Sequence, residues 1–179
     1  MDLKKLSEPL AIHQIDFRVQ SINKGGYATI LAYKDARVDM QRLDEVCGPL
    51  NWKREHSRDN HNYTVSIWDA DRLHWVGKED TGTESNTEAQ KGLASDSFKR
   101  ACFNWGIGRE LYDYPLIQVK LKAEEFSEES GRVKATWKLR LREWIWFSQW
   151  ADGQLTYLAA KDSDGLRYSY GKFTQEAAA

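Results

Sequence analysis

The sequence predicts an α+β fold in which a curved antiparallel β-sheet packs on one long helix. A run of extended segments precedes a long amphipathic segment, and the last third of the chain returns to alternating apolar and polar residues. Its 179 residues suffice for one core, and 41% hydrophobic residues exclude a disordered chain. We expect a core domain over residues 1–121, an acidic loop over 122–131, and a C-terminal β extension of the same domain over 132–179.

The first elements are predicted to be a short helix, a β-hairpin and a second helix. The short helix ends near Leu10, and the hairpin strands cover residues 15–22 and 27–33 around a turn with two glycines. The second helix covers about residues 35–47, before Gly48 and Pro49 end it. Its predicted buried face consists of Ala36, Met40, Leu43 and Cys47.

A three-stranded meander and the long helix follow. The strands are expected at residues 52–58, 63–69 and 73–78, joined by turns rich in Asp and Asn. Residues 84–112 read as one amphipathic helix, capped by Asn86 or Thr87 and ended at Gly106. Apolar residues recur there at i, i+4, i+7, i+8 and i+11, which places them on one buried stripe. They are Ala94, Phe98, Ala101, Cys102 and Trp105.

Two adjacent cations lie on the opposite side of this long helix. Lys99 and Arg100 fall about 100° and 200° from Phe98, on the face that the apolar stripe leaves open. A neighbouring Lys-Arg pair on a rigid helix can contact successive phosphates. The alternative is an ordinary solvated face with an Asp96–Arg100 ion pair at i, i+4, and helical spacing alone leaves both interpretations open.

The last third of the chain combines cations with tryptophans. An acidic loop is expected over residues 123–131, and strict alternation predicts one strand over residues 136–147. One side of this strand is expected to be core: Trp137, Leu139, Leu141, Ile145 and Phe147. The other side could contact phosphates and stack bases, or pack on a neighbouring subunit or on a hairpin of residues 154–160 and 167–170. It carries Lys138, Arg140, Arg142, Trp144 and Trp146.

Charge and composition limit the class of protein. With 26 basic and 27 acidic residues the net charge is −1, so a nucleic-acid binder would need its cations clustered, as they are in residues 134–142. No apolar run approaches the roughly 20 residues that span a bilayer, and the N-terminus lacks a signal-peptide core. Cys47 and Cys102 are isolated thiols, which fits a reducing compartment. We expect a cytoplasmic protein that does not bind membranes.

The sequence gives little support to an enzyme. Residues 165–173 have one residue too many for a phosphate-binding loop and Phe where the metal-binding hydroxyl belongs. No histidine pair has metal-ligand spacing on a helix. We therefore expect no catalytic residues, no metal and no cofactor.

Two alternatives of other classes remain open. The first is a metal-dependent nuclease that uses carboxylates at strand ends, although turn formation explains the same residues. These carboxylates are Asp69, Asp71, Glu79 and Asp80. The second is a carbohydrate- or peptide-binding module that uses the tryptophan-rich strands.

Three sequence blocks lie in order within about residues 8–115. They read YKDARV with RLDEVCGPLNW (33–52), HWVGKED (74–80), and TEAQKG, SDSFKRA and WGIGRELY (87–112). Together they resemble the Rad52/22 single-strand annealing family, in the form carried by bacteriophages. The resemblance implies ATP-independent binding and annealing of single-stranded DNA in homologous recombination and double-strand break repair. It also implies a homo-oligomeric ring with a positively charged groove, a phage-encoded protein in the bacterial host cytoplasm, and a single-stranded DNA-binding protein as a candidate partner.

The resemblance also assigns DNA-binding residues. Lys99 and Arg100 correspond to inner-groove DNA contacts, and Arg37 to their partner from the preceding helix. Arg42 is the alternative to Arg37, because the spacing from Arg37 to Trp52 is one residue longer than in eukaryotic relatives. Further candidates, each of which could instead be an ordinary surface cation, are Lys91, Arg109 and Lys78.

Overall fold

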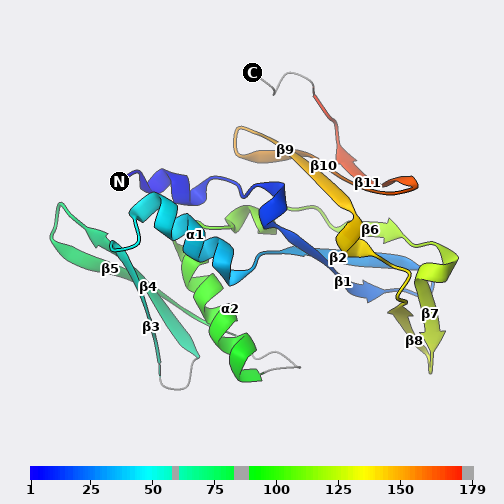
Figure 1. The fold of residues 1–179 in the computed structure, drawn as a ribbon, viewed down its shortest axis with the longest axis horizontal. Helices are drawn as coiled ribbons and strands as arrows, with labels where there is room; N and C mark the ends of the chain where they lie inside the picture. Colours follow the sequence, from blue (N-terminus) through cyan, green and yellow to red (C-terminus); the bar gives the residue numbers. More distant parts are fainter. Residues whose placement is uncertain (58–60, 83–88, 175–179) are drawn as a thin grey trace. The chain divides into compact units, whose positions relative to one another are not determined.

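The computed structural model of the chain describes residues 1–57, 61–82 and 89–174, with side chains in the last range described from Ala94 onward. These ranges contain two α-helices and eleven strands, and the strands form four antiparallel sheets (Figure 1). The predicted α+β class is therefore confirmed. The chain divides into two compact units: unit 1 is Met1–Leu10 with Asp35–Arg109, and unit 2 is Ala11–Lys34 with Glu110–Ala179. The division expected from the sequence, at residues 121 and 131, is a different one and stays a prediction.

Unit 1 consists of a meander and two helices, as the sequence predicted. Strands β3 (Trp52–His56), β4 (Asn62–Asp69) and β5 (His74–Thr81) form one sheet in that order. Helix α1 (Ala36–Cys47) begins at Asp35, whose carboxylate accepts a hydrogen bond from the Arg37 amide at 2.8 Å. It ends at Gly48, whose φ of 83° is a conformation that glycine adopts without strain. The N-terminal helix is a 3₁₀ helix, η1 (Leu3–Ser7).

Helix α2 (Ala89–Asn104) packs on β4 and β5 through the predicted apolar stripe. Phe98, Ala101 and Cys102 are at most 2% exposed, and Ala94 and Trp105 pack against them. The Trp105 indole also donates a hydrogen bond to the Val65 carbonyl at 2.8 Å. The predicted caps Asn86 and Thr87 lie outside the described residues, whereas Gly106 has the expected positive φ, 107°. Both cysteines are buried thiols, and burial raises the pKa of Cys47 to about 11.

Unit 2 contains the remaining strands in three sheets. The predicted hairpin is β1 (Asp16–Ile22) and β2 (Tyr27–Tyr33), which continues to β6 (Ile117–Lys120). The predicted C-terminal hairpin is β10 (Gln154–Asp162) and β11 (Gly165–Gly171), joined on the other side of β10 by β9 (Ile145–Ala151). The other elements are η2 (Ile12–Gln14), η3 (Arg109–Tyr112), η4 (Ala123–Glu125), β7 (Phe126–Glu129), β8 (Arg132–Ala135) and η5 (Leu141–Glu143).

Two predictions about sheet connectivity were wrong. The hairpin and the meander do not share one curved sheet: β2 pairs with β1 and β6, whereas β4 pairs with β3 and β5 in a separate sheet. The acidic segment 123–131 is not an open loop: it forms η4 and then β7, which pairs with β8. Lys134 pairs with Ser127 in this hairpin, so the acidic and basic segments of the sequence are adjacent strands.

The single strand predicted over residues 136–147 was also wrong. The 3₁₀ helix η5 interrupts it, with the Glu143 amide bonded to the Arg140 carbonyl at 2.9 Å. A period of two assigns faces only along an unbroken strand, so the predicted sides change at this turn. Trp144, predicted to face outward, is 7% exposed, whereas Trp137, predicted to be core, is 78% exposed. Ile145 and Phe147 are likewise exposed rather than buried.

Among the described residues, neither helix has the length and apolar character that crossing a bilayer requires.

Candidate nucleic-acid interface

Lys99 and Arg100 lie on α2 immediately after the buried Phe98, and both are half-buried. The Arg100 Nε atom donates to the Asp96 carboxylate at 3.0 Å, so the i, i+4 pair considered from the sequence is formed. The Arg100 side chain is nevertheless 42% exposed. An ion pair at such exposure contributes at most about 1 kcal/mol. The two interpretations of this face are therefore compatible, because Arg100 can exchange its partner for a phosphate at little cost.

Arg37 lies at the start of α1 and is 86% exposed. Its Nε atom is 2.9 Å from the Asp35 carboxylate. Hydrogen bonds from the Arg37 side chain and amide lower the pKa of Asp35, and the positive charges of Arg37 and Lys99 add to the effect. Lys99 is thus near enough to act on the same carboxylate, and α1 and α2 are in contact. The positive charges of Arg37 and Lys99 therefore act on one acidic side chain.

Arg42, the alternative to Arg37, has a different role. It is 9% exposed, and its Nη1 atom donates to the carbonyls of Lys5 and Glu8 at 2.8 and 2.9 Å. These bonds attach the N-terminal segment to α1. Of the two candidates, Arg37 has the side chain that a ligand can reach.

Lys78 and Arg109 meet at the C-terminal end of α2. The Lys78 Nζ atom donates to the Asn104 carbonyl at 2.8 Å and lies 4.3 Å from the centroid of the Trp105 ring. Arg109 donates to the same carbonyl at 2.9 Å and to the Phe103 carbonyl at 2.8 Å. Cations at a helix C-terminus satisfy its last carbonyls and complement the helix dipole. Lys78 and Arg109 therefore cap α2, and DNA contacts by these two residues stay predictions.

The capping bond of Lys78 should stabilise unit 1. We expect Lys78→Met to lower the free energy of unfolding by about 1–2 kcal/mol, because a charged donor to a helix-end carbonyl and a cation–π contact are lost. Lys53→Met is a matched control: Lys53 also lies over an indole, Trp75, at 5.3 Å, but it is exposed and its ion pair within the described residues is with Glu55. Urea unfolding of both variants checks this, and equal losses in the two would contradict the capping role.

The remaining cation predicted from the sequence is Lys91. It lies in the first turns of α2, but its side chain is outside the described residues.

Sequence reasoning missed Arg54 on β3. Trp52, Arg54 and His56 alternate on the side of the strand whose partners, Ile67, Val65 and Tyr63, are buried in the core of unit 1. The exposed Arg54 guanidinium lies 5.5 Å from the centroid of the Phe98 ring, next along α2 to Lys99. The two-residue spacing of Arg54 from Trp52, which places both side chains on one side of the strand, was the available sequence signal. We refer to Arg37, Arg54, Lys99 and Arg100 together as the cationic face of unit 1.

The carboxylates considered for a nuclease are engaged in local structure. Asp69 accepts bonds from the amides of Asp71 and Arg72, and hydrogen bonds from the Arg72 side chain and backbone lower its pKa. Glu79 accepts from Asn62 and Thr64 on β4. No group of three potential metal ligands is found in the part of the chain that the structure describes. Asp69 therefore behaves as a turn-forming residue.

Comparison with known proteins agrees with the family suggested by the sequence. Residues 71–130, which include β5 and α2, match the model of the Rad52/22 family double-strand break repair protein. The single-stranded DNA-binding protein DdrA of Deinococcus radiodurans is 34% identical over 115 residues, covering 63% of this chain and 55% of the relative. DdrA of Deinococcus deserti is also 34% identical over 115 residues, covering 63% and 57%.

The chain spans a little over half the length of these curated relatives. No solved structure matches it significantly. The family match includes Lys99 and Arg100 together with the helix that carries them. The family model and the two relatives therefore confirm the resemblance to the Rad52/22 family that the three sequence blocks predicted.

Proposed function

We propose that the chain binds single-stranded DNA and anneals complementary strands, without ATP, in recombination and double-strand break repair. The observation that carries the proposal is the cationic face of unit 1, where the charges of Arg37 and Lys99 both act on Asp35 and Arg100 follows Lys99. The two DdrA relatives, which are named for binding single-stranded DNA, support the same ligand.

The chemistry of this face suits annealing. Guanidinium and ammonium groups bind phosphates without reading sequence. Lys99 and Arg100 are on a helix whose buried side is fixed in the core of unit 1, so their spacing is rigid. A strand bound by its backbone keeps its base edges available for a complementary strand. No hydrolysis is needed, because pairing itself supplies the free energy.

One copy would bind weakly. About four phosphate contacts per subunit imply a salt slope near −0.7 × 4, or roughly fifty-fold weaker binding between 50 and 200 mM salt. Linked copies restore affinity because each later contact is intramolecular. We therefore propose a homo-oligomeric ring. Its phage origin, its place in the bacterial cytoplasm and an accessory single-stranded DNA-binding protein are parts of the same proposal.

The test is binding and annealing by the purified chain. Fluorescence anisotropy of labelled oligothymidine should show binding that weakens with salt, and complementary strands should pair without ATP. Negative-stain images should show closed rings. Shortening of the labelled strand on addition of Mg²⁺ would instead support a nuclease, and quenching by glycans but not by oligothymidine would support a carbohydrate-binding module. A monomer indifferent to oligothymidine at low salt would refute the proposal.

A further inference from the structure

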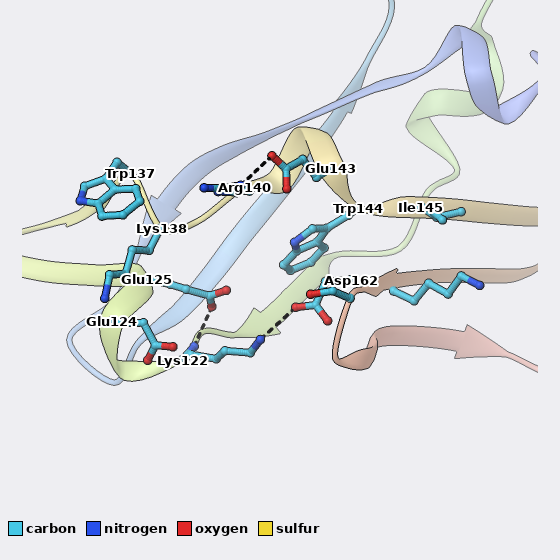
Figure 2. Close-up of a pocket in the computed structure, with 12 residues that line it drawn as sticks. Lys122, Glu124, Glu125, Trp137, Lys138, Arg140, Glu143, Trp144, Ile145 and Asp162 are labelled. Carbon is cyan, nitrogen blue, oxygen red and sulfur yellow. Dashed lines mark hydrogen bonds and ion pairs between the residues drawn. The ribbon is translucent and has the colours of Figure 1, made fainter.

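A second aromatic and cationic surface lies in unit 2. A cavity of about 530 Å³ opens between η4, the turn before η5 and the end of β10 (Figure 2). We call it the Trp137 pocket. The residues that define it here are Trp137, Lys138, Arg140, Trp144 and Lys161. Its volume is within the range of sites that hold one small organic group.

Trp137 is the most exposed indole described on this chain, at 78%. It follows β8 in a turn that the Thr136 hydroxyl stabilises, with bonds to the Glu124 carbonyl at 2.6 Å and from the Lys138 amide at 3.3 Å. The Lys138 Nζ atom lies 5.8 Å from the centroid of the Trp137 ring. An exposed aromatic face beside a cation is the arrangement that holds an unpaired base and its phosphate.

The charges of the pocket leave cations available near this indole. Arg167 binds Glu125 and Asp162 at 2.7 and 2.5 Å, and Lys122 also binds Asp162 at 3.1 Å, so these two cations balance the two most buried carboxylates of the pocket. Glu143 pairs with Arg140 at 3.3 Å, as the dashed line in Figure 2 shows. Within the described residues neither Lys138 nor Lys161 forms an ion pair. Glu124 is the opposing charge on the rim.

We propose that the Trp137 pocket is a second contact for single-stranded nucleic acid, in which an unpaired base stacks on Trp137 and Lys138 and Lys161 contact the adjoining phosphates. The ligand follows from the proposed function, and the surface is additional to the cationic face of unit 1. A neutral glycan would leave both lysines unused, and an acidic peptide would have no need of an exposed indole. The nucleotide uses both features.

Photocrosslinking of the full chain tests the contact directly. Oligothymidine carrying 5-iododeoxyuridine at successive positions is irradiated with the protein, and the crosslinked peptide is mapped by mass spectrometry. We expect a crosslink at Trp137. Crosslinks confined to unit 1 would overturn this inference and leave the proposed function intact, whereas absence of oligothymidine binding by the unmodified chain would overturn both.

Affinity measurements separate stacking from charge. Trp137→Ala should weaken oligothymidine binding at least about fivefold, the lower end of the loss expected for one stacked base. Trp137→Phe should retain most of the affinity, and Lys138→Ala should weaken binding more than Lys172→Ala, an exposed lysine of unit 2 outside the pocket. Unchanged affinity in Trp137→Ala, or quenching of Trp137 by a glycan or an acidic peptide and not by oligothymidine, would overturn the proposal.

Discussion

Replacing Lys99 and Arg100 together by alanine should remove annealing and weaken binding of single-stranded DNA at least about tenfold. Two charge-assisted phosphate contacts are lost per subunit, and one such bond contributes about 1.5–3 kcal/mol. The salt dependence should also become shallower by about 0.7 × 2 per subunit bound. Both side chains are half-buried on α2, and the ion pair of Arg100 with Asp96 lies at the surface. The fold and the oligomer should therefore persist.

The control for this variant must change charge equally. Lys4→Ala with Lys5→Ala removes two exposed cations from η1 in the same unit, and it should leave annealing nearly unchanged. Anisotropy, strand pairing and circular dichroism on both double variants check the prediction. Full annealing by the Lys99→Ala, Arg100→Ala chain would refute the assignment of DNA contacts to α2, even if the chain still binds DNA.

The helices could be predicted because their signals are local. In α1, the apolar face and the stop at Gly48 are within one short stretch of the chain, and the structure confirms both of them. In α2, one stripe of apolar residues identified the buried side. The meander followed from turns rich in Asp, such as the one that Asp69 forms. Such signals do not depend on contacts that are distant in sequence.

Sheet partners and faces could not be predicted in the same way. Nothing near Ile117–Lys120 indicates that this strand pairs with β2, almost ninety residues earlier. Residues 136–147 alternate well enough to read as a strand, but Thr136 and η5 turn the chain twice within them. The environments of two tryptophans are therefore the reverse of those predicted: Trp146 stacks on Phe17 with ring centroids 3.6 Å apart, and Trp137 is exposed.

The candidate site shows the same division. The sequence and the family resemblance indicated Lys99, Arg100 and Arg37 as candidate DNA contacts, because these residues lie within short motifs of the chain. The capping roles of Lys78 and Arg109 depend on β5 and η3 converging on one carbonyl at Asn104. Arg54 was missed because β3 is short and mostly exposed, which weakens its pattern. The role of a charged side chain depends on the helix or strand that packs against it, and a single sequence does not show which element that is.

The buried ion cluster of unit 2 gives the second large expected effect: Arg167→Ala should lower the free energy of unfolding by about 3–5 kcal/mol at neutral pH. Arg167 is 8% exposed, donates to both Glu125 oxygens at 2.9 and 2.7 Å and to Asp162, and lies 4.4 Å from the centroid of the Trp144 ring. Removing it leaves two carboxylates, 6% and 12% exposed, without their main counter-charge. Arg132→Ala, at an exposed position on β8, is the control.

The pH dependence distinguishes lost charge from lost packing. Burial is the largest single influence and would raise the pKa of Glu125 and Asp162, but the hydrogen bonds and positive charge of Arg167, together with Lys122 and backbone hydrogen bonds, outweigh it and lower both pKa values below their usual 4.5 and 3.8. The stability this provides is present above those usual values and is lost as pH falls through the lowered pKa values. Without Arg167 the buried carboxylates should protonate more readily, so the deficit of the variant should shrink below about pH 4.

Urea unfolding at pH 7 and near pH 3.5 measures this deficit directly. A gap between the natural chain and Arg167→Ala that narrows in acid assigns the loss to unpaired carboxylates. A gap of constant size would instead assign it to the contact between Arg167 and Trp144, which does not titrate. In the first case the Trp137 pocket depends on Arg167 for its charge balance, because Lys122 alone would otherwise offset the negative charges of Glu125 and Asp162 that face an incoming phosphate.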